Sequence, residues 1–274
     1  MVRSLRKMAT PLGIVPGETA TLNLPLGLTY DRLDIEMNVD VSTVATDVPI
    51  ANWGDYIDEV RLIVDGQTLY QAEASFMVAY ALYHGQALVP GVLPLFLERP
   101  WMLTTADQMI TSYGTANGTV GSLTMEIDLK AGITVNHLRV WSKRSPPRDW
   151  GSHLRLQRHA HNQSVGGEAE LQMFSPGPYG MLTMHLDTAA ISDLQVISNN
   201  RIVKESNALL RAADQATAGR TPQTGYTHVD FLTEDIMTEM LDMRVDDFRL
   251  KPTFTGSGPG AVSIYTETLR AAFG

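Results

Sequence analysis

The sequence predicts an all-β protein made of two tandem jelly rolls, each an eight-stranded β-sandwich with a short helix inserted between strands. Three observations predict this fold. Short segments with the alternation of strands recur about every 8–12 residues, two predicted hairpins align without a gap, and the segments around both hairpins follow in the same order. The 274 residues are enough for two such domains, each with its own core.

The clearest repeat is a pair of predicted β-hairpins, residues 57–70 and 191–204, the second starting 134 residues after the first. Asp65-Gly66 and Asn199-Asn200 occupy the same place in the two hairpins. Both dipeptides tolerate the positive φ angles of a type I′ turn, and β-branched residues flank each of them. An internal duplication is the simplest account of this match.

In the first half, the predicted order is strand, strand, hairpin, helix, strand, short helix, strand. Ser75 is placed to cap the first helix, which ends near a glycine. The ranges are 18–24, 30–37, 57–70, 75–83, 93–98, 106–110 and 122–129.

The stretch from Ala74 to Leu97 carries no formal charge and is long enough to span a bilayer. Pro90, Gly91 and Pro94 would interrupt a helix there and leave backbone groups unsatisfied in lipid. We therefore expect a short helix, a turn and a buried strand in this stretch.

The second half repeats this order, with Ser206 placed to cap the helix. Its ranges are 168–173, 179–186, 191–204, 206–214, 226–232, 236–241 and 262–268. Ala131-Gly132 separates two strand patterns, which predicts domains at residues 1–132 and 133–274. Each repeat also has a segment that the other lacks: residues 39–56 are an insertion in the first copy, and residues 143–165 are an extended lead-in before the first strand of the second copy.

Composition excludes several function classes. The net charge of −9 opposes a surface that grips nucleic-acid phosphates, so no direct contact with nucleic acid is expected. With no cysteine, disulfides, thiolate metal sites and cysteine nucleophiles are absent. The charged fraction of 19% is below the usual ~25%, which slightly favours burial against other copies of the chain. The N-terminal residues lack the apolar run of a secretion signal.

Charge is distributed in two blocks of opposite sign. Residues 139–158 contain six basic residues and one acid, whereas residues 230–247 contain seven acids and Arg244. The blocks could pair between neighbouring copies, or both could be solvated faces. Within the acidic block, Asp246 and Asp247 are the candidate ligands for a divalent cation, because adjacent carboxylates that face a neighbour would be stabilised by a hard ion.

The competing class is a cupin-like metal-dependent enzyme or a carbohydrate-binding jelly-roll protein. Its candidate ligands are His159, His161, Glu168 and His185. Six residues separate His161 from Glu168, more than the three or so between these ligands in cupins, and metal ligands on strands must project inward on a period of two. No nucleophile motif or phosphate loop occurs, so no catalytic residue is predicted.

Residues along most of the chain carry a resemblance to a known family. In the first half these are Leu24–Tyr30, Val64–Gly66, Arg99-Pro100 and Gly118–Ile127; in the second half they are Tyr226-Thr227, Asp230-Phe231 and Phe248–Lys251. The sequence resembles the double jelly-roll major capsid proteins of tailless, membrane-containing icosahedral bacteriophages, of the corticovirus type. Little is recognisable between residues 135 and 166.

The resemblance implies a structural protein of the virion, assembled in the host cytoplasm. It implies a homotrimer of pseudo-hexagonal outline that tiles an icosahedral shell over an internal membrane. Penton proteins, minor membrane proteins and the viral membrane are the implied partners. Structural calcium is the one implied ion, without ligands that can be carried over to this sequence; no cofactor is required.

The N-terminal segment, Met1–Met8, contains Arg3, Arg6 and Lys7, with no acid before Glu18. In the capsid interpretation this segment faces the membrane, where each cation near an anionic lipid surface would gain roughly 1 kcal/mol at low salt. The alternative is a disordered tail without a partner.

Overall fold

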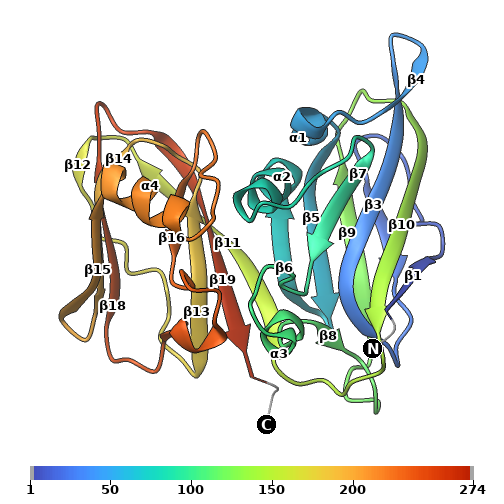
Figure 1. Ribbon diagram of the computed structural model, residues 1–274. Coiled ribbons are helices and arrows are strands. Elements are labelled where there is room, and N and C mark those ends of the chain that lie inside the picture. The colour runs from blue at the N-terminus through green and yellow to red at the C-terminus, as the bar shows by residue number, and fades with distance from the viewer. Residues whose placement is uncertain (1–2, 272–274) are drawn as a thin grey trace. The chain divides into compact units, whose positions relative to one another are not determined.

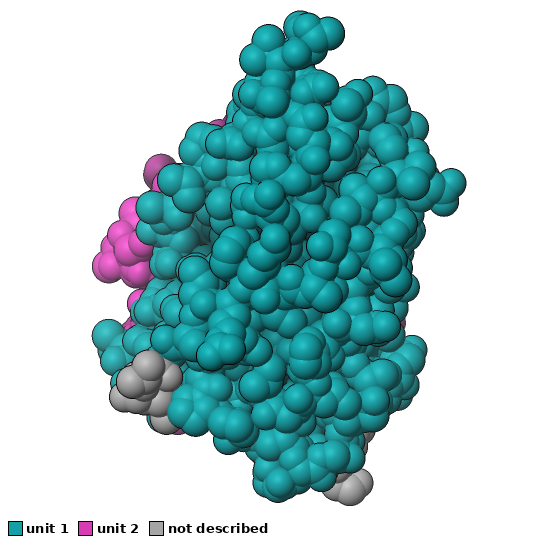
Figure 2. All heavy atoms as spheres, turned by 90° about the vertical axis from the view of Figure 1, so that its right-hand side faces the viewer, with its two compact units in different colours: residues 1–156, 272–274 teal, residues 157–271 magenta. Residues whose placement is uncertain are grey.

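The computed structural model describes residues 3–271, and the chain forms two compact units, residues 3–156 and 157–271 (Figures 1 and 2). Each unit contains two sheets of short strands. Most segments with the alternating pattern of strands are strands in the structure, and the two segments that follow the hairpins are helices, as predicted.

The first sheet of unit 1 has the strand order β1-β10-β3, and β7 and β8 both pair with the other side of β3. β4 pairs with the end of β3 in a hairpin that extends beyond the neighbouring strands in Figure 1. The strands are β1 (Ser4–Lys7), β3 (Thr29–Val41), β4 (Val44–Asp47), β7 (Val92–Phe96), β8 (Tyr113–Gly114) and β10 (Val135–Ser145). The second sheet has the order β2-β9-β5-β6, with β2 (Thr19–Asn23), β5 (Ile57–Val64), β6 (Gln67–Glu73) and β9 (Leu123–Leu129).

Unit 2 has the same two sheets. The first has the order β11-β19-β13-β16, with β17 also along β13, and the second has the order β12-β18-β14-β15. Their strands are β11 (His153–Gln163), β12 (Gly167–Glu168), β13 (Tyr179–Leu186), β14 (Ile191–Ser198), β15 (Arg201–Asn207), β16 (Thr227–Asp230), β17 (Leu241–Asp242), β18 (Phe248–Phe254) and β19 (Gly260–Arg270). Apart from β4, which occurs in unit 1 alone among the described residues, each strand of unit 1 has a counterpart in unit 2. This is the jelly-roll topology, so the predicted fold is confirmed.

The duplicated hairpins match residue for residue. β5 and β6 become β14 and β15 when 134 is added to their numbers, and α2 (Ala74–Tyr83) becomes α4 (Ala208–Thr217) in the same way. The turn residues Asp65, Asn199 and Asn200 all have positive φ. Both hairpins also contain a bulge at the same step, after Leu62 and after Val196. A shared bulge is a specific feature of a strand pair, so this match supports duplication strongly.

The predicted caps of the two longer helices were wrong. α2 starts at Ala74, which places Ser75 inside its first turn, and no side chain caps it. α4 is capped by Asn207, whose side-chain oxygen accepts a hydrogen bond from the Leu210 amide at 2.8 Å, while Ser206 belongs to β15. The shorter pieces are η1 (Ile50–Asn52), α1 (Trp53–Tyr56), α3 (Thr105–Met109) and η2 (Met237–Glu239).

The predicted domain boundary at 132/133 is corrected to 156/157. β10 lies beyond the predicted boundary, yet it pairs with β3 from Val135 to Ser145 and with β1. The error arose because the sequence alignment equated the strands at 122–129 and 262–268. The sheets instead equate β9 with β18 and β10 with β19, so β10 closes the first jelly roll.

Two further expectations need correction. The predicted strand at 168–173 is reduced to β12 and an isolated bridge between Leu171 and Leu250. The predicted lead-in at 143–165 is the end of β10 followed by β11, which is the first strand of the second jelly roll.

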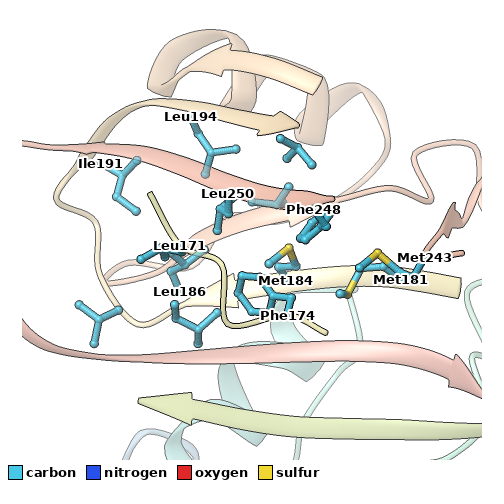
Figure 3. Packing of buried hydrophobic residues seen from close by; sticks show 14 of the residues in the cluster. Leu171, Phe174, Met181, Met184, Leu186, Ile191, Leu194, Met243, Phe248 and Leu250 are labelled. Atoms are coloured by element: carbon cyan, nitrogen blue, oxygen red, sulfur yellow. The ribbon is translucent and has the colours of Figure 1, made fainter. Parts of the chain in front are cut away.

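The core of unit 2 lies between its two sheets (Figure 3). Met184 and Leu186 come from β13, Leu194 from β14, and Phe248 and Leu250 from β18, and each is less than 4% exposed. Burial of this kind supplies the main favourable free energy of a sandwich.

The described part of the N-terminal segment is tied to unit 1. Ser4–Lys7 forms β1 and pairs with β10, and the Arg3 guanidinium lies 2.6 Å from the buried carboxylate of Glu98. The alternative of a disordered tail is therefore wrong for Ser4–Lys7, whereas Met1 and Val2 lie outside the described residues. The predicted helix, turn and strand between Ala74 and Leu97 are confirmed. In the described part of the chain, no helix has the length and apolar character needed to cross a membrane.

Candidate functional site

The four candidate ligands of the cupin-like interpretation have separate partners. His159 lies 3.1 Å from the Thr266 hydroxyl, and His161 lies 3.1 Å from the Gln163 side chain. Glu168 forms an ion pair with Lys251 at 3.0 Å. Within residues 3–271, no group of three or more His, Asp or Glu side chains is arranged to hold a metal. These residues therefore do not assemble the predicted metal centre.

His185 instead meets a residue that the sequence analysis did not select. Its Nδ1 lies 2.6 Å from Nδ1 of His228, because β13 and β16 place the two residues directly opposite each other. Both imidazoles are at most 2% exposed. The signal in the sequence was a histidine on each of two predicted strands, but only the register of the sheet shows that they pair.

The hydrogen bonds around this pair form a chain in which each group donates to the next. The Gln223 amide donates to His228 Nε2 at 3.2 Å, so His228 carries its proton on Nδ1 and donates to His185 Nδ1. His185 then donates from Nε2 to the Thr183 hydroxyl at 3.0 Å, and that hydroxyl donates to Glu267 at 2.7 Å. A backbone amide thus fixes the tautomer of His228 and the direction of the hydrogen bonds that follow it.

Electrostatics keep His228 uncharged. Burial in a poorly solvated position, with smaller contributions from His185 and Arg211, lowers the pKa of His228 to about 2. A neutral imidazole at such a pKa cannot exchange protons near neutral pH, so the pair does not resemble a general acid or base tuned to its working pH.

The acidic block of residues 230–247 is not one solvated surface. Asp230 is 2% exposed and lies 2.8 Å from the Arg220 guanidinium, which also contacts Asp235 at 2.6 Å. Burial alone would lower the pKa of Arg220, but Asp230 and Asp235 more than offset this and raise it. Arg244 pairs with Asp242 at 2.6 Å. Most of this block is therefore used in short ion pairs within unit 2.

Two residues of the basic block 139–158 also form ion pairs within unit 1. Arg139 contacts Glu36 at 3.0 Å, and the hydrogen bond from Trp141 holds the pKa of Glu36 below its usual range. Lys143 contacts the buried carboxylate of Glu98 at 2.6 Å. Arg139 and Lys143 therefore already have carboxylate partners in unit 1. Pairing of the two blocks between copies stays a prediction.

The two aspartates proposed as cation ligands are adjacent but differently placed. Asp246 is exposed, whereas Asp247 lies 2.9 Å from the Arg249 guanidinium. Ca²⁺ takes six to eight oxygen ligands, so these two carboxylates alone would leave its shell incomplete. The proposed ligand roles remain predictions.

Comparison with protein families decides the class of the molecule. The model of the viral coat protein P2 N-terminal domain matches residues 5–145, and that of the C-terminal domain matches residues 153–272. The chain belongs to the viral coat protein P2 family. The gap between the two matches contains the β10–β11 connection, close to the observed boundary between the units. No significant match was found among curated proteins.

Solved structures agree with the P2 fold along the whole chain. The major capsid protein P2 from bacteriophage PM2 has a TM-score of 0.86 and 17% identity, with 99% of this chain and 98% of that chain covered. The STIV MCP has a TM-score of 0.70 and 12% identity over 98% and 97% of the two chains. The PBCV-1 virus capsid model has a TM-score of 0.65 and 8% identity over 100% and 97%. At these identities the likeness shows the fold.

Membership in the P2 family gives the function in outline. The chain is a viral coat protein, and its place is the capsid of the virion. The family favours this structural role over the cupin-like or carbohydrate-binding alternative, and the separated histidines agree with it. The resemblance read from the sequence is confirmed.

Proposed function

We propose that this coat protein forms homotrimers of pseudo-hexagonal outline that tile an icosahedral shell over an internal membrane. Three copies contribute six jelly rolls of like topology, which suits a sixfold outline built on threefold symmetry. Penton proteins and minor membrane proteins would complete the shell, and assembly would take place in the host cytoplasm.

The observation that carries the proposal is an apolar surface on unit 2. We define the β15–α4 surface as Ile202, Val203, Leu209 and Leu210, which are 54%, 47%, 79% and 61% exposed. In unit 1 the position equivalent to Leu210 is Phe76, which is 1% exposed. Large apolar side chains that an edge strand and the helix after it leave in water are typical of an interaction site.

A second copy of this chain is the occupant that we propose for the β15–α4 surface. A coat protein must associate with itself to form a shell, and the surface lies on an edge strand and the helix beside it. Unpaired edge strands with exposed apolar residues readily bind another chain, so natural proteins cover them.

Replacing both Leu209 and Leu210 with glutamate should prevent trimer formation, because the charges would be buried against a neighbour. Sedimentation equilibrium measures this directly: we expect wild-type particles of three 30.1 kDa chains and single chains for the variant. Leu12→Glu is the matched control, because Leu12 is 75% exposed but lies in unit 1. A wild-type protein of about 30 kDa at micromolar concentration would contradict the trimer. Unchanged trimers of the double variant would contradict this surface.

We further propose that calcium stabilises contacts between subunits, with Asp246 and Asp247 as two of its ligands and the remaining oxygens from a neighbour. Chelation should then lower the melting temperature of assembled particles while leaving trimers intact. The variant Asp246→Asn/Asp247→Asn should be insensitive to the chelator. Particles that melt at the same temperature with and without chelator would exclude this role for calcium.

The N-terminal segment remains a candidate for membrane contact, with a smaller set of available cations than the sequence suggested. Arg3 is paired with Glu98, whereas Arg6 and Lys7 are exposed on β1. Arg6 and Lys7 would therefore supply the attraction to anionic lipid, without Arg3.

A further inference from the structure

A pocket of about 150 Å³ in unit 2 lies between one face of α4 and the segments that lead into β14 and β16. α4 lines it with Ala208, Arg211, Ala212 and Gln215, which recur every three or four residues and so share one helix face. Tyr226, in the segment before β16, also lines the pocket. Figure 1 shows the full length of α4 next to β14 and β16.

Arg211 is the unusual member of this pocket. Arg211 is 7% exposed. Its guanidinium donates hydrogen bonds to two carbonyl oxygens, that of Ile191 at 3.0 Å and that of Ser206 at 3.4 Å. Within the described residues it forms no ion pair with a carboxylate. A guanidinium has five N–H donors, so donors remain after these two bonds.

The electrostatic surroundings show the same lack of an anion. Burial lowers the pKa of Arg211, and Asp193 is the acid that acts against this from a distance. Of the described residues that line the pocket, Arg211 alone is charged, since His228 is held neutral. A buried cation without a close anion is costly, and a bound anion would remove that cost.

The size of the pocket limits what could bind. A volume of 150 Å³ corresponds to about five water molecules at ≈ 30 Å³ each, enough for one phosphate group. Whole ligands such as nucleotides occupy pockets of ≈ 300–1,000 Å³. Arginine also matches the oxygens of phosphate in a paired geometry, which favours an oxyanion with several acceptors.

We propose that this pocket binds one phosphate group through Arg211, as free inorganic phosphate or as the headgroup of a phospholipid. Arg211 supplies the charge, and Gln215 fixes the wall of the pocket by donating a hydrogen bond to the His228 carbonyl at 2.7 Å. The three alanines of the wall leave the space that the ligand fills. This proposal is independent of trimer formation.

The test is a titration of the full chain with inorganic phosphate at constant ionic strength, followed by isothermal calorimetry and by the melting temperature. We expect saturable binding that raises the melting temperature of the wild type. Arg211→Gln should weaken binding at least tenfold. Ala212→Leu keeps the arginine and fills the pocket from an exposed helix position, so it should weaken binding similarly while preserving the fold.

The matched control is Arg201→Gln, which removes one exposed positive charge from the same unit and should bind phosphate like the wild type. Equal affinity in all four proteins would mean an adventitious ion only and would overturn the proposal, as would the absence of saturable binding. Sedimentation with phosphatidic acid vesicles distinguishes the two sources. If the wild type binds the vesicles and Ala212→Leu does not, the ligand is a lipid headgroup. If the wild type binds phosphate but not the vesicles, the ligand is the free ion.

Discussion

Replacing Asp230 with alanine is expected to lower the free energy of unfolding of unit 2 by about 3–5 kcal/mol. The reason is the position of Arg220, whose side chain is 3% exposed and is held by Asp230 at 2.8 Å. Without that carboxylate, the close partners left to the buried guanidinium among the described residues would be Asp235 and the Leu232 carbonyl. Urea denaturation with hydrogen exchange of peptides from β13 and β16 would measure the loss in the unit concerned.

The comparison variants separate burial from charge. Asp242→Ala removes an ion pair whose side chains are 73% and 55% exposed, and should leave stability nearly unchanged. Replacing both partners, Arg220→Met with Asp230→Leu, should cost less than Asp230→Ala alone, because no unpaired charge is then buried. If Asp230→Ala and Asp242→Ala have equal effects, the burial argument is wrong.

Acidification is expected to destabilise unit 2 through His228. Its pKa is about 2 in the folded chain and near 6.5 in an unfolded one, so below pH 6.5 the unfolded chain binds more protons. The associated stability is complete above pH 6.5 and falls by about 1.4 kcal/mol for each pH unit below it, or roughly 2 kcal/mol at pH 5. Unfolding free energies measured between pH 7 and 4 test this slope.

A difference between proteins isolates His228 from other groups that titrate. Burial raises the pKa values of Asp31 and Asp34 in unit 1, and carboxyls of that kind favour the folded state as the pH falls, which is the opposite sign. We therefore expect His228→Gln to lose the part of the acid dependence that comes from His228, about 1.4 kcal/mol for each pH unit below 6.5, while His161→Gln keeps it. Parallel pH profiles for the wild type and His228→Gln would refute the assignment.

The elements that could be predicted from sequence are those set by neighbours in the chain. The hairpin turns at Asp65-Gly66 and Asn199-Asn200 depend on the φ preferences of two residues, and both formed. Strands β2, β3, β13 and β19 show alternation or apolar runs that need no distant partner to be visible.

The strands that could not be assigned from the sequence are those whose polar side chains have their partners far away along the chain. β10 and β11 carry Arg, Lys and His at positions that alternate with apolar residues. Arg139 reaches Glu36, 103 residues earlier, and without that partner the segment resembles a solvated connection. Misassigning β10 then moved the predicted boundary.

The candidate site shows the same limit. His185 was selected as the last candidate ligand of the cupin-like pattern, but its partner is His228, 43 residues later. The sequence analysis assigned no role to Arg211 or Arg220. Their neighbours in the sequence do not show that Arg211 is buried against carbonyl oxygens or that Arg220 is buried between two carboxylates. Burial of a charge is a tertiary property, so these sites became visible only in the fold.

The division of the chain at 156/157 also separates its chromophores. All four tryptophans, at positions 53, 101, 141 and 150, belong to unit 1, and the aromatic absorbers of unit 2 near 280 nm are tyrosines. Emission excited at long wavelength therefore reports on one jelly roll, whereas circular dichroism sums the two. An unlabelled protein can thus be followed as two separate optical signals, and the order in which the duplicated domains fold or melt can be read from the lag between them.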